Sequence, residues 1–153
     1  MSARDVSEPQ LEAPKEIFDR AGHRAHRLGV SYAGAVTPAE AHRLSEAGAA
    51  RIVDVRTPEE WRDVGHVVGP PLIVWPRDGT CPQVQAFLDE LREQFDPSQP
   101  VLFLCRSGVR SHYAAHVAAM SGFTRAYNVL EGFEGHPGAG DGWRTAGLPW
   151  ERS

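Results

Sequence analysis

The sequence predicts an α/β fold in which helices flank a parallel sheet of about five strands. Short apolar segments that end at turn residues alternate with segments of helical periodicity, which is the pattern of repeated strand–helix–strand units. The segment VLFL at 101–104 is apolar at every position, as expected for a strand that is covered on both faces. The 153 residues, of which 41% are hydrophobic and 24% charged, suffice for one globular domain.

The bulk composition argues against several classes of function. A formal net charge of −4 provides no basic surface for nucleic acid or for an anionic membrane. The apolar runs are too short to span a bilayer, and the polar start lacks the apolar segment of a signal peptide. The two cysteines are not at metal-ligand spacing. We therefore expect a cytoplasmic protein without metal or cofactor, in a reducing compartment that suits a free thiol.

The start of the chain differs from the rest in its many charges and few large apolar side chains. Residues 1–27 are interpreted as an N-terminal extension, helical from about Ala13 to His23, and residues 28–153 as the compact domain. The sequence is compatible with an extension that docks on the domain and with one that stays free of it.

Capping signals predict two helices in the next part of the chain. The residues TPAE at 37–40 combine a threonine N-cap, a proline in the first turn and a glutamate three residues after the cap, and the helix should end near Ala47. The residues TPEE at 57–60 repeat this signal and open a second short helix. The apolar segments 50–55 and 72–75 are expected to be strands.

The second half of the chain continues the alternation. Apolar residues recur at helical spacing over 82–95 and again over 109–120. The segments 101–104 and 126–130 are expected to be buried strands. The glycine-rich tail, 131–153, is expected to be mostly loop.

A cysteine ends the apolar strand at 101–104, and the loop sequence CRSGVRS occupies 105–111. Ligands of parallel sheets bind beyond the carboxyl ends of the strands, so Cys105 should lie in a binding site. Backbone N–H groups at a helix N-terminus and nearby arginines both stabilise a thiolate, which points to a nucleophilic or sulfur-carrying cysteine. The residues expected to bind an anionic substrate are Arg106, Ser107, Gly108, Val109, Arg110 and Ser111.

The simplest alternative is a buried structural cysteine, because free cysteine is among the most buried residue types. The surroundings of Cys105 argue against it. The next five residues include two arginines and a serine–glycine pair, which are better suited to binding an anion than to packing in a core.

Three ordered motifs resemble those of the rhodanese-like sulfurtransferases. The loop at 105–111 resembles their active-site loop, and DVRTPEEW at 54–61, followed by Gly65-His66, resembles an upstream motif of the family. Downstream, YNVLEG at 127–132 and the Trp143 to Pro149 segment resemble its closing motif. The resemblance covers about residues 29–150 and implies a three-layer rhodanese-like fold with Cys105 as the catalytic residue.

The chain departs from the family pattern in three places. Residues 67–71 read VVGPP where Ile-Pro-Gly-Ala is usual, and Phe133 occupies a position where a second glycine is common. Residues 134–141 form a longer glycine-rich insertion, which we expect near the rim of the site.

The mechanism that the resemblance implies is sulfur transfer in two steps. The Cys105 thiolate takes the outer sulfur of a small anionic donor such as thiosulfate. Cyanide or a thiol, on a small molecule or a protein, then removes it from the resulting persulfide. Arg106 and Arg110 would attract the donor. Asp54 and Arg56 are supporting residues. Either Asp54 orients a loop arginine, or both residues are structural and pair with each other or cap turns.

Two other functions use the same fold. One is a non-catalytic interaction module, which should lack the cysteine. The other is a cysteine-dependent phosphatase or arsenate reductase, whose loop is one residue longer between the cysteine and the phosphate-binding arginine. Four residues separate Cys105 from Arg110, and Ser111 stands at the next position, which favours sulfur transfer.

Three further groups are interpreted as structural. His66 is expected to fix a turn, since attack by a thiolate needs no base. His112 and His116 share a helix face but lack an evident third metal ligand. Cys81 follows a turn-like segment and is treated as an incidental thiol.

Overall fold

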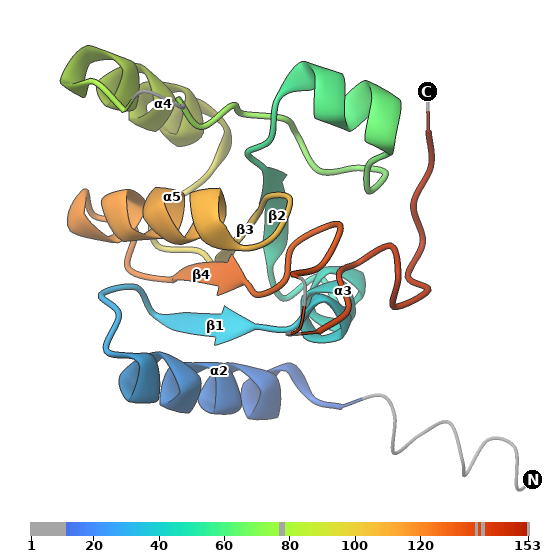
Figure 1. The fold of residues 1–153 in the computed structure, drawn as a ribbon. Helices are drawn as coiled ribbons and strands as arrows, with labels where there is room; N and C mark the ends of the chain where they lie inside the picture. The colour runs from blue at the N-terminus through green and yellow to red at the C-terminus, as the bar shows by residue number, and fades with distance from the viewer. Residues whose placement is uncertain (1–11, 77–78, 137, 139, 153) are drawn as a thin grey trace, which may run out of the picture.

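A four-stranded, fully parallel sheet forms the centre of the molecule (Figure 1). The computed structural model describes residues 12–76, 79–136, 138 and 140–152, and its sheet has the order β1-β4-β3-β2. The strands are β1 Gly34–Val36, β2 Arg51–Asp54, β3 Val101–Leu104 and β4 Ala126–Val129. The α/β class with a parallel sheet is therefore confirmed, with one strand fewer than the expected number of about five.

Helices cover both faces of this sheet, so the molecule has three layers. Alternate residues of β3 enter different cores: Phe103 packs with α4 and α5, whereas Leu102 and Leu104 pack with α2 and α3. Burial on both faces explains why this strand is apolar at every position. The helices are α2 Pro14–Leu28, α3 Pro38–Glu46, α4 Cys81–Gln94 and α5 Val109–Met120.

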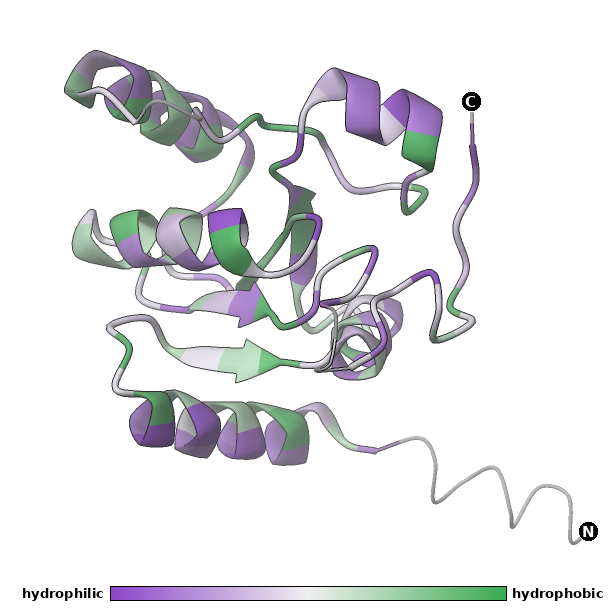
Figure 2. Ribbon diagram, viewed as in Figure 1, coloured by the Kyte–Doolittle hydropathy of each residue, from purple (hydrophilic) through white to green (hydrophobic). Residues whose placement is uncertain are grey.

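Helix α2 lies along β1 although it is a largely hydrophilic helix (Figures 1 and 2). Ile17, Ala21 and Ala25, which are spaced by one helical turn, are its buried residues. Gly29, with φ of 69°, ends the helix in the left-handed conformation. The division of the chain into an extension at 1–27 and a domain from residue 28 stays a prediction, and residues 1–11 lie outside the described part.

Replacing Ile17 with alanine tests whether α2 belongs to the stable core. Ile17 is 1% exposed and lies in the cluster that includes Leu44 and Leu102. We expect the free energy of unfolding to fall by about 3 kcal/mol, the cost of a cavity left by a large aliphatic side chain. Leu28→Ala is the control on the same helix, because Leu28 is 56% exposed and should cost less than about 1 kcal/mol. Equal losses in denaturant unfolding of the two variants would contradict the packing described.

The expectation of a strand at 72–75 is wrong. Leu72 forms a single parallel bridge to Asp54, and the backbone N–H groups of Ile73 and Trp75 reach the carbonyl oxygens of Asp54 and Val55 at 2.9 and 3.0 Å. Prolines at 70–71 and at 76 have no N–H to donate, so the pairing does not continue as a ladder. Strand β1 is not predicted from the sequence, because it is only three residues long and shows no periodicity.

The two predicted capping signals are both present. Thr37 accepts a hydrogen bond from the Glu40 N–H at the start of α3, and Thr57 does the same with Glu60. After Thr57 the chain forms the π-helix η2, Glu60–Val64, in place of a regular α-helical segment. This π-helix begins at Glu60, whose carboxylate accepts hydrogen bonds from Arg110 in the segment after Cys105.

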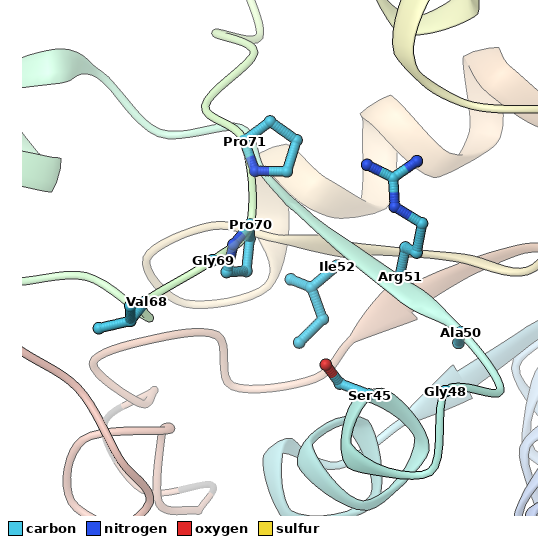
Figure 3. A pocket seen from close by; sticks show the side chains of 9 residues that line it. All are labelled: Ser45, Gly48, Ala50, Arg51, Ile52, Val68, Gly69, Pro70 and Pro71. Carbon is cyan, nitrogen blue, oxygen red and sulfur yellow. The ribbon is translucent and has the colours of Figure 1, made fainter.

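A cleft of about 250 Å³ lies beside the amino-terminal half of β2, where no other strand of the described residues pairs with its outer edge (Figure 3). Arg51 and Ile52 form one wall, and Val68 to Pro71 form the other. The Arg51 guanidinium donates to the carbonyl oxygen of Gln94 at 2.7 Å. None of the site residues expected from the sequence lines this cleft, which lies toward the end of β2 opposite to Asp54.

Candidate active site

Cys105 directly follows β3 at the carboxyl end of the sheet. Leu104 pairs in register with Asp54 of the neighbouring β2, so the ends of the two strands lie side by side. The loop after Cys105 leads into α5, which begins at Val109. Cys105 is only 1% exposed, so protein groups rather than water surround its sulfur. The expected position at the carboxyl ends of the strands is therefore what the structure has.

Two groups of the loop and helix contact the Cys105 sulfur. The N–H of Gly108 donates a hydrogen bond to Sγ at 3.2 Å, and the hydroxyl of Ser111 lies 3.2 Å from it. Gly108 has φ of 97°, a conformation that glycine adopts without strain. The convergence of further loop N–H groups on the sulfur and the substrate contacts of all six residues at 106–111 stay predictions.

Arg110 is held beside the loop by a carboxylate from a distant part of the sequence. Its two terminal nitrogens donate to the two oxygens of Glu60 at 2.7 and 2.8 Å. Burial raises the pKa of Glu60, but the bonds from Arg110 and Thr57 outweigh it and bring the pKa to about 2. The sequence predicts Glu60 as a helix-capping residue within the upstream motif at 54–61, and not as the partner of Arg110. The fork-shaped pair shows that Glu60 holds the Arg110 side chain beside the loop.

Replacing Glu60 with glutamine should destabilise the fold at neutral pH by about 2 kcal/mol, because one charge of a half-buried ion pair is lost. The pKa of Glu60 is lowered from 4.5 to about 2 on folding, so its contribution is complete above pH 4.5 and disappears as pH falls through about 2. The difference in unfolding free energy between the two proteins, measured in denaturant over this range, should therefore shrink toward zero. A pH-independent difference would contradict the role of the charge.

The second loop arginine lies at the rim of an open pocket. Arg106 has a side chain that is 64% exposed, and its Nε lies 3.4 Å from a carboxylate oxygen of Glu134. The pocket of about 470 Å³ at this place shows that the glycine-rich insertion forms part of the rim, except for residues 137 and 139, which lie outside the described part. Its lining residues are Arg106, Ser107, Glu134, Gly135, His136, Gly140, Asp141 and Thr145.

Asp54 and Arg56 pair with each other. The Arg56 Nη2 donates to Asp54 at 2.8 Å and to the carbonyl oxygen of Gly65 at 2.8 Å. The ring of Phe133 lies against the same guanidinium, 4.5 Å from its carbon atom. Phe133 thus covers a buried cation at the position where the family commonly has glycine. Of the two roles considered for Asp54, the structure has the pair with Arg56, and Glu60 is the residue that orients the loop arginine.

The turn after β4 is hydrogen-bonded to the backbone of the cysteine loop. The N–H groups of Phe133 and Glu134 donate to the carbonyl oxygens of Cys105 and Arg106 at 2.8 and 2.9 Å. Glu131 and Gly132 both have positive φ, 61° and 57°, which brings the chain close enough for these bonds. The loop is therefore held by backbone contacts as well as by Glu60.

The three histidines interpreted as structural have local partners. His66 is buried, stacks on Trp61 with ring centroids 3.5 Å apart, and is hydrogen-bonded to the Trp61 carbonyl oxygen. His112 and His116 are hydrogen-bonded to the hydroxyls of Tyr32 and Ser31, respectively. Cys81 is exposed at the start of α4.

Within the described residues, no group of three or more histidine, cysteine, aspartate or glutamate side chains is arranged to hold a metal ion. In the same part of the chain, no helix is long and apolar enough to cross a bilayer.

The model of the rhodanese-like domain matches residues 37–136, which include the cysteine loop and the segment that carries Glu60. The chain belongs to the rhodanese-like domain family. The resemblance seen in the sequence motifs is therefore confirmed, and so is the α/β fold of that family.

Relatives within the rhodanese-like family include a thiosulfate sulfurtransferase, GlpE of Actinobacillus pleuropneumoniae, which is 30% identical over 121 residues. The match covers 76% of this chain and 91% of that protein. The crystal structure of Rv0390 from M. tuberculosis superimposes with a TM-score of 0.67 at 45% identity, over 80% of this chain and 99% of that one.

A Rhodopseudomonas palustris protein described as a possible tyrosine phosphatase, RPA3614, is similar at 26% identity with a TM-score of 0.61. The match covers 92% of this chain and 95% of that one. The rhodanese-like fold thus occurs in proteins described with either kind of cysteine chemistry, and the cysteine loop has to distinguish between them.

Proposed function

We propose that this chain is a sulfurtransferase that carries a sulfane sulfur as a persulfide on Cys105. In the first step the Cys105 thiolate attacks the outer sulfur of thiosulfate, the bond between the two donor sulfurs breaks, and sulfite leaves with the electron pair. In the second step cyanide or a thiolate attacks the terminal sulfur of the persulfide, and the Cys105 thiolate is released. Both steps are displacements at sulfur and need no metal or organic cofactor.

The main support for this proposal comes from the groups that surround the Cys105 sulfur. A buried sulfur that accepts the Gly108 N–H, with the Ser111 hydroxyl 3.2 Å away and able to turn toward it, is suited to an anionic atom that gains and loses one neighbour. The match to a family that includes a thiosulfate sulfurtransferase supports the same chemistry.

The donor and acceptor are proposed by chemical class. A small anionic sulfur donor would enter at the rim, where the mostly exposed Arg106 stands beside the pocket of about 470 Å³. The acceptor is cyanide or a thiol, either on a small molecule or on a protein. The acidic net charge argues against nucleic acid and anionic membranes as partners, and a free reactive thiol suits the cytoplasm.

The phosphatase alternative is less well supported. A phosphate group requires a bidentate arginine that is free at the end of the loop, whereas the fork of Arg110 is occupied by Glu60. The non-catalytic alternative does not account for a cysteine sulfur that is hydrogen-bonded by its own loop.

Steady-state kinetics with thiosulfate and cyanide test the proposal. A persulfide intermediate predicts parallel double-reciprocal plots when both substrates are varied, since the first product leaves before the acceptor binds. An aryl phosphate is the matched alternative substrate under the same conditions. Hydrolysis of the aryl phosphate without thiocyanate formation would contradict the proposal and support the phosphatase alternative.

A further inference from the structure

The buried hydroxyl of Ser111 lies between two groups that compete for its single hydrogen. Its Oγ is 3.2 Å from the Cys105 sulfur and 2.5 Å from Oδ1 of Asn128, a residue of β4. The exposed fractions of Cys105, Ser111 and Asn128 are 1%, 0% and 3%, so bulk water does not complete their hydrogen bonding. The hydrogen can point to only one of the two neighbours at a time.

The loop itself determines which way the Asn128 amide faces. The Asn128 Nδ2 donates to the carbonyl oxygen of Gly108 at 3.2 Å. Because a backbone carbonyl can only accept, the nitrogen and not the oxygen of the amide must face it. Oδ1 is therefore turned toward Ser111, and since an amide oxygen also only accepts, the Ser111 hydroxyl must be the donor in that contact.

We propose that Asn128 is a positioning residue which, acting through Ser111, makes the Cys105 thiolate harder to form than it would be without this side chain. With its hydrogen directed at Asn128, Ser111 presents a lone pair to the sulfur, and this lone pair accepts the S–H of a thiol. A thiolate needs a donor at the same place. For Cys105 to ionise, the Ser111 hydroxyl must rotate toward the sulfur, which leaves the Asn128 oxygen buried without its donor.

The charged side chains near the sulfur are each paired with an opposite charge. Arg110 is the cation that acts on Cys105 across the loop, and its charge is balanced by the two bonds to Glu60. Asp54 is balanced by Arg56 in the same way. The Gly108 N–H donates to the sulfur in both states, so the direction of the Ser111 hydroxyl is the hydrogen bond that differs between thiol and thiolate. Alkylation and oxidation begin from the thiolate, so the contact between Ser111 and Asn128 also slows both reactions.

This inference deepens the proposed function, but its test does not require sulfur transfer. The variant is Asn128→Leu, which keeps the size of the side chain and removes the acceptor, in a Cys81→Ser background that leaves Cys105 as the sole thiol. Ser111 is then free to donate to the sulfur. At neutral pH, alkylation of Cys105 by iodoacetamide should be about tenfold faster, with a matching gain in the ultraviolet absorbance of the thiolate, as expected for one hydrogen bond to a charged group.

Two further variants show whether Asn128 acts through Ser111. Asn128→Asp keeps an acceptor for Ser111, so it should produce no acceleration. In a Ser111→Ala background, Asn128→Leu should change the alkylation rate by less than about twofold, because no hydroxyl is left to redirect. Persulfide formation is measured separately, so its loss would affect the proposed function and not this inference.

The proposal is overturned if Asn128→Leu accelerates alkylation equally with and without Ser111, because Asn128 would then act by closing the loop. It is also overturned if folded Asn128→Leu shows no acceleration. Asn128→Ala carries the same expectation with a smaller side chain, so a folding defect in one variant does not decide the result.

Discussion

Replacing Cys105 with serine should abolish sulfur transfer from thiosulfate to cyanide. A serine hydroxyl is not ionised at neutral pH and forms no persulfide, so the half-reaction that stores the sulfur is lost. We expect the rate of thiocyanate formation to fall by about 10³-fold or more, to the level of the uncatalysed reaction. The fold should persist, because serine is close in size to the buried cysteine.

The other cysteine provides the matched control for this substitution. Cys81 is exposed at the start of α4, outside the loop that follows β3. Cys81→Ser should keep the activity of the unsubstituted protein. Activity that survives Cys105→Ser, or that is lost in Cys81→Ser, would contradict the assignment of the nucleophile.

Replacing Gly132 with alanine should cause the second large effect, on stability and activity together. A Cβ at this position would lie 2.5 Å from the carbonyl oxygen of Cys105 and 2.6 Å from the carbonyl carbon of Arg106, and φ is 57°. Because these are backbone atoms of the cysteine loop, the loop itself would have to move. We expect a loss of about 3 kcal/mol or more in unfolding free energy, together with reduced sulfur transfer.

Gly48→Ala separates the steric contact from the strained backbone. Gly48 has a similar φ of 70°, but a Cβ there would meet nothing within 4 Å. It should cost only about 1 kcal/mol, the strain of a left-handed alanine, and leave activity unchanged. Equal losses of stability in the two variants would show that the Gly132 contact does not determine the position of the loop.

The sequence predicts best the elements whose pattern is local and repeated. Strand 101–104 and helix 109–120 have the predicted bounds, because a continuous apolar run and a regular helical spacing are both encoded within a dozen residues. The failures lie where that information is short or contradictory. β1 has three residues, and the apolar 72–75 segment is flanked by prolines that interrupt its pairing.

The candidate site could be predicted as a loop, but its partners could not. Cys105, Gly108 and Ser111 are neighbours in the sequence, and their mutual contacts follow from one strand–loop–helix turn. Glu60 is fifty residues from Arg110, and a capping signal already accounts for it locally. Asn128 stands in a short buried strand, where only the folded structure shows which polar groups it faces.

The central claim, a persulfide on Cys105, is tested most directly by the intact mass of the protein after incubation with thiosulfate. The unsubstituted chain and Cys81→Ser should each gain one sulfur atom, and cyanide should remove it. Cys105→Ser should gain none. An unchanged mass of the unsubstituted protein with thiosulfate and with other sulfane sulfur donors would contradict the claim, as would a gain that persists in Cys105→Ser.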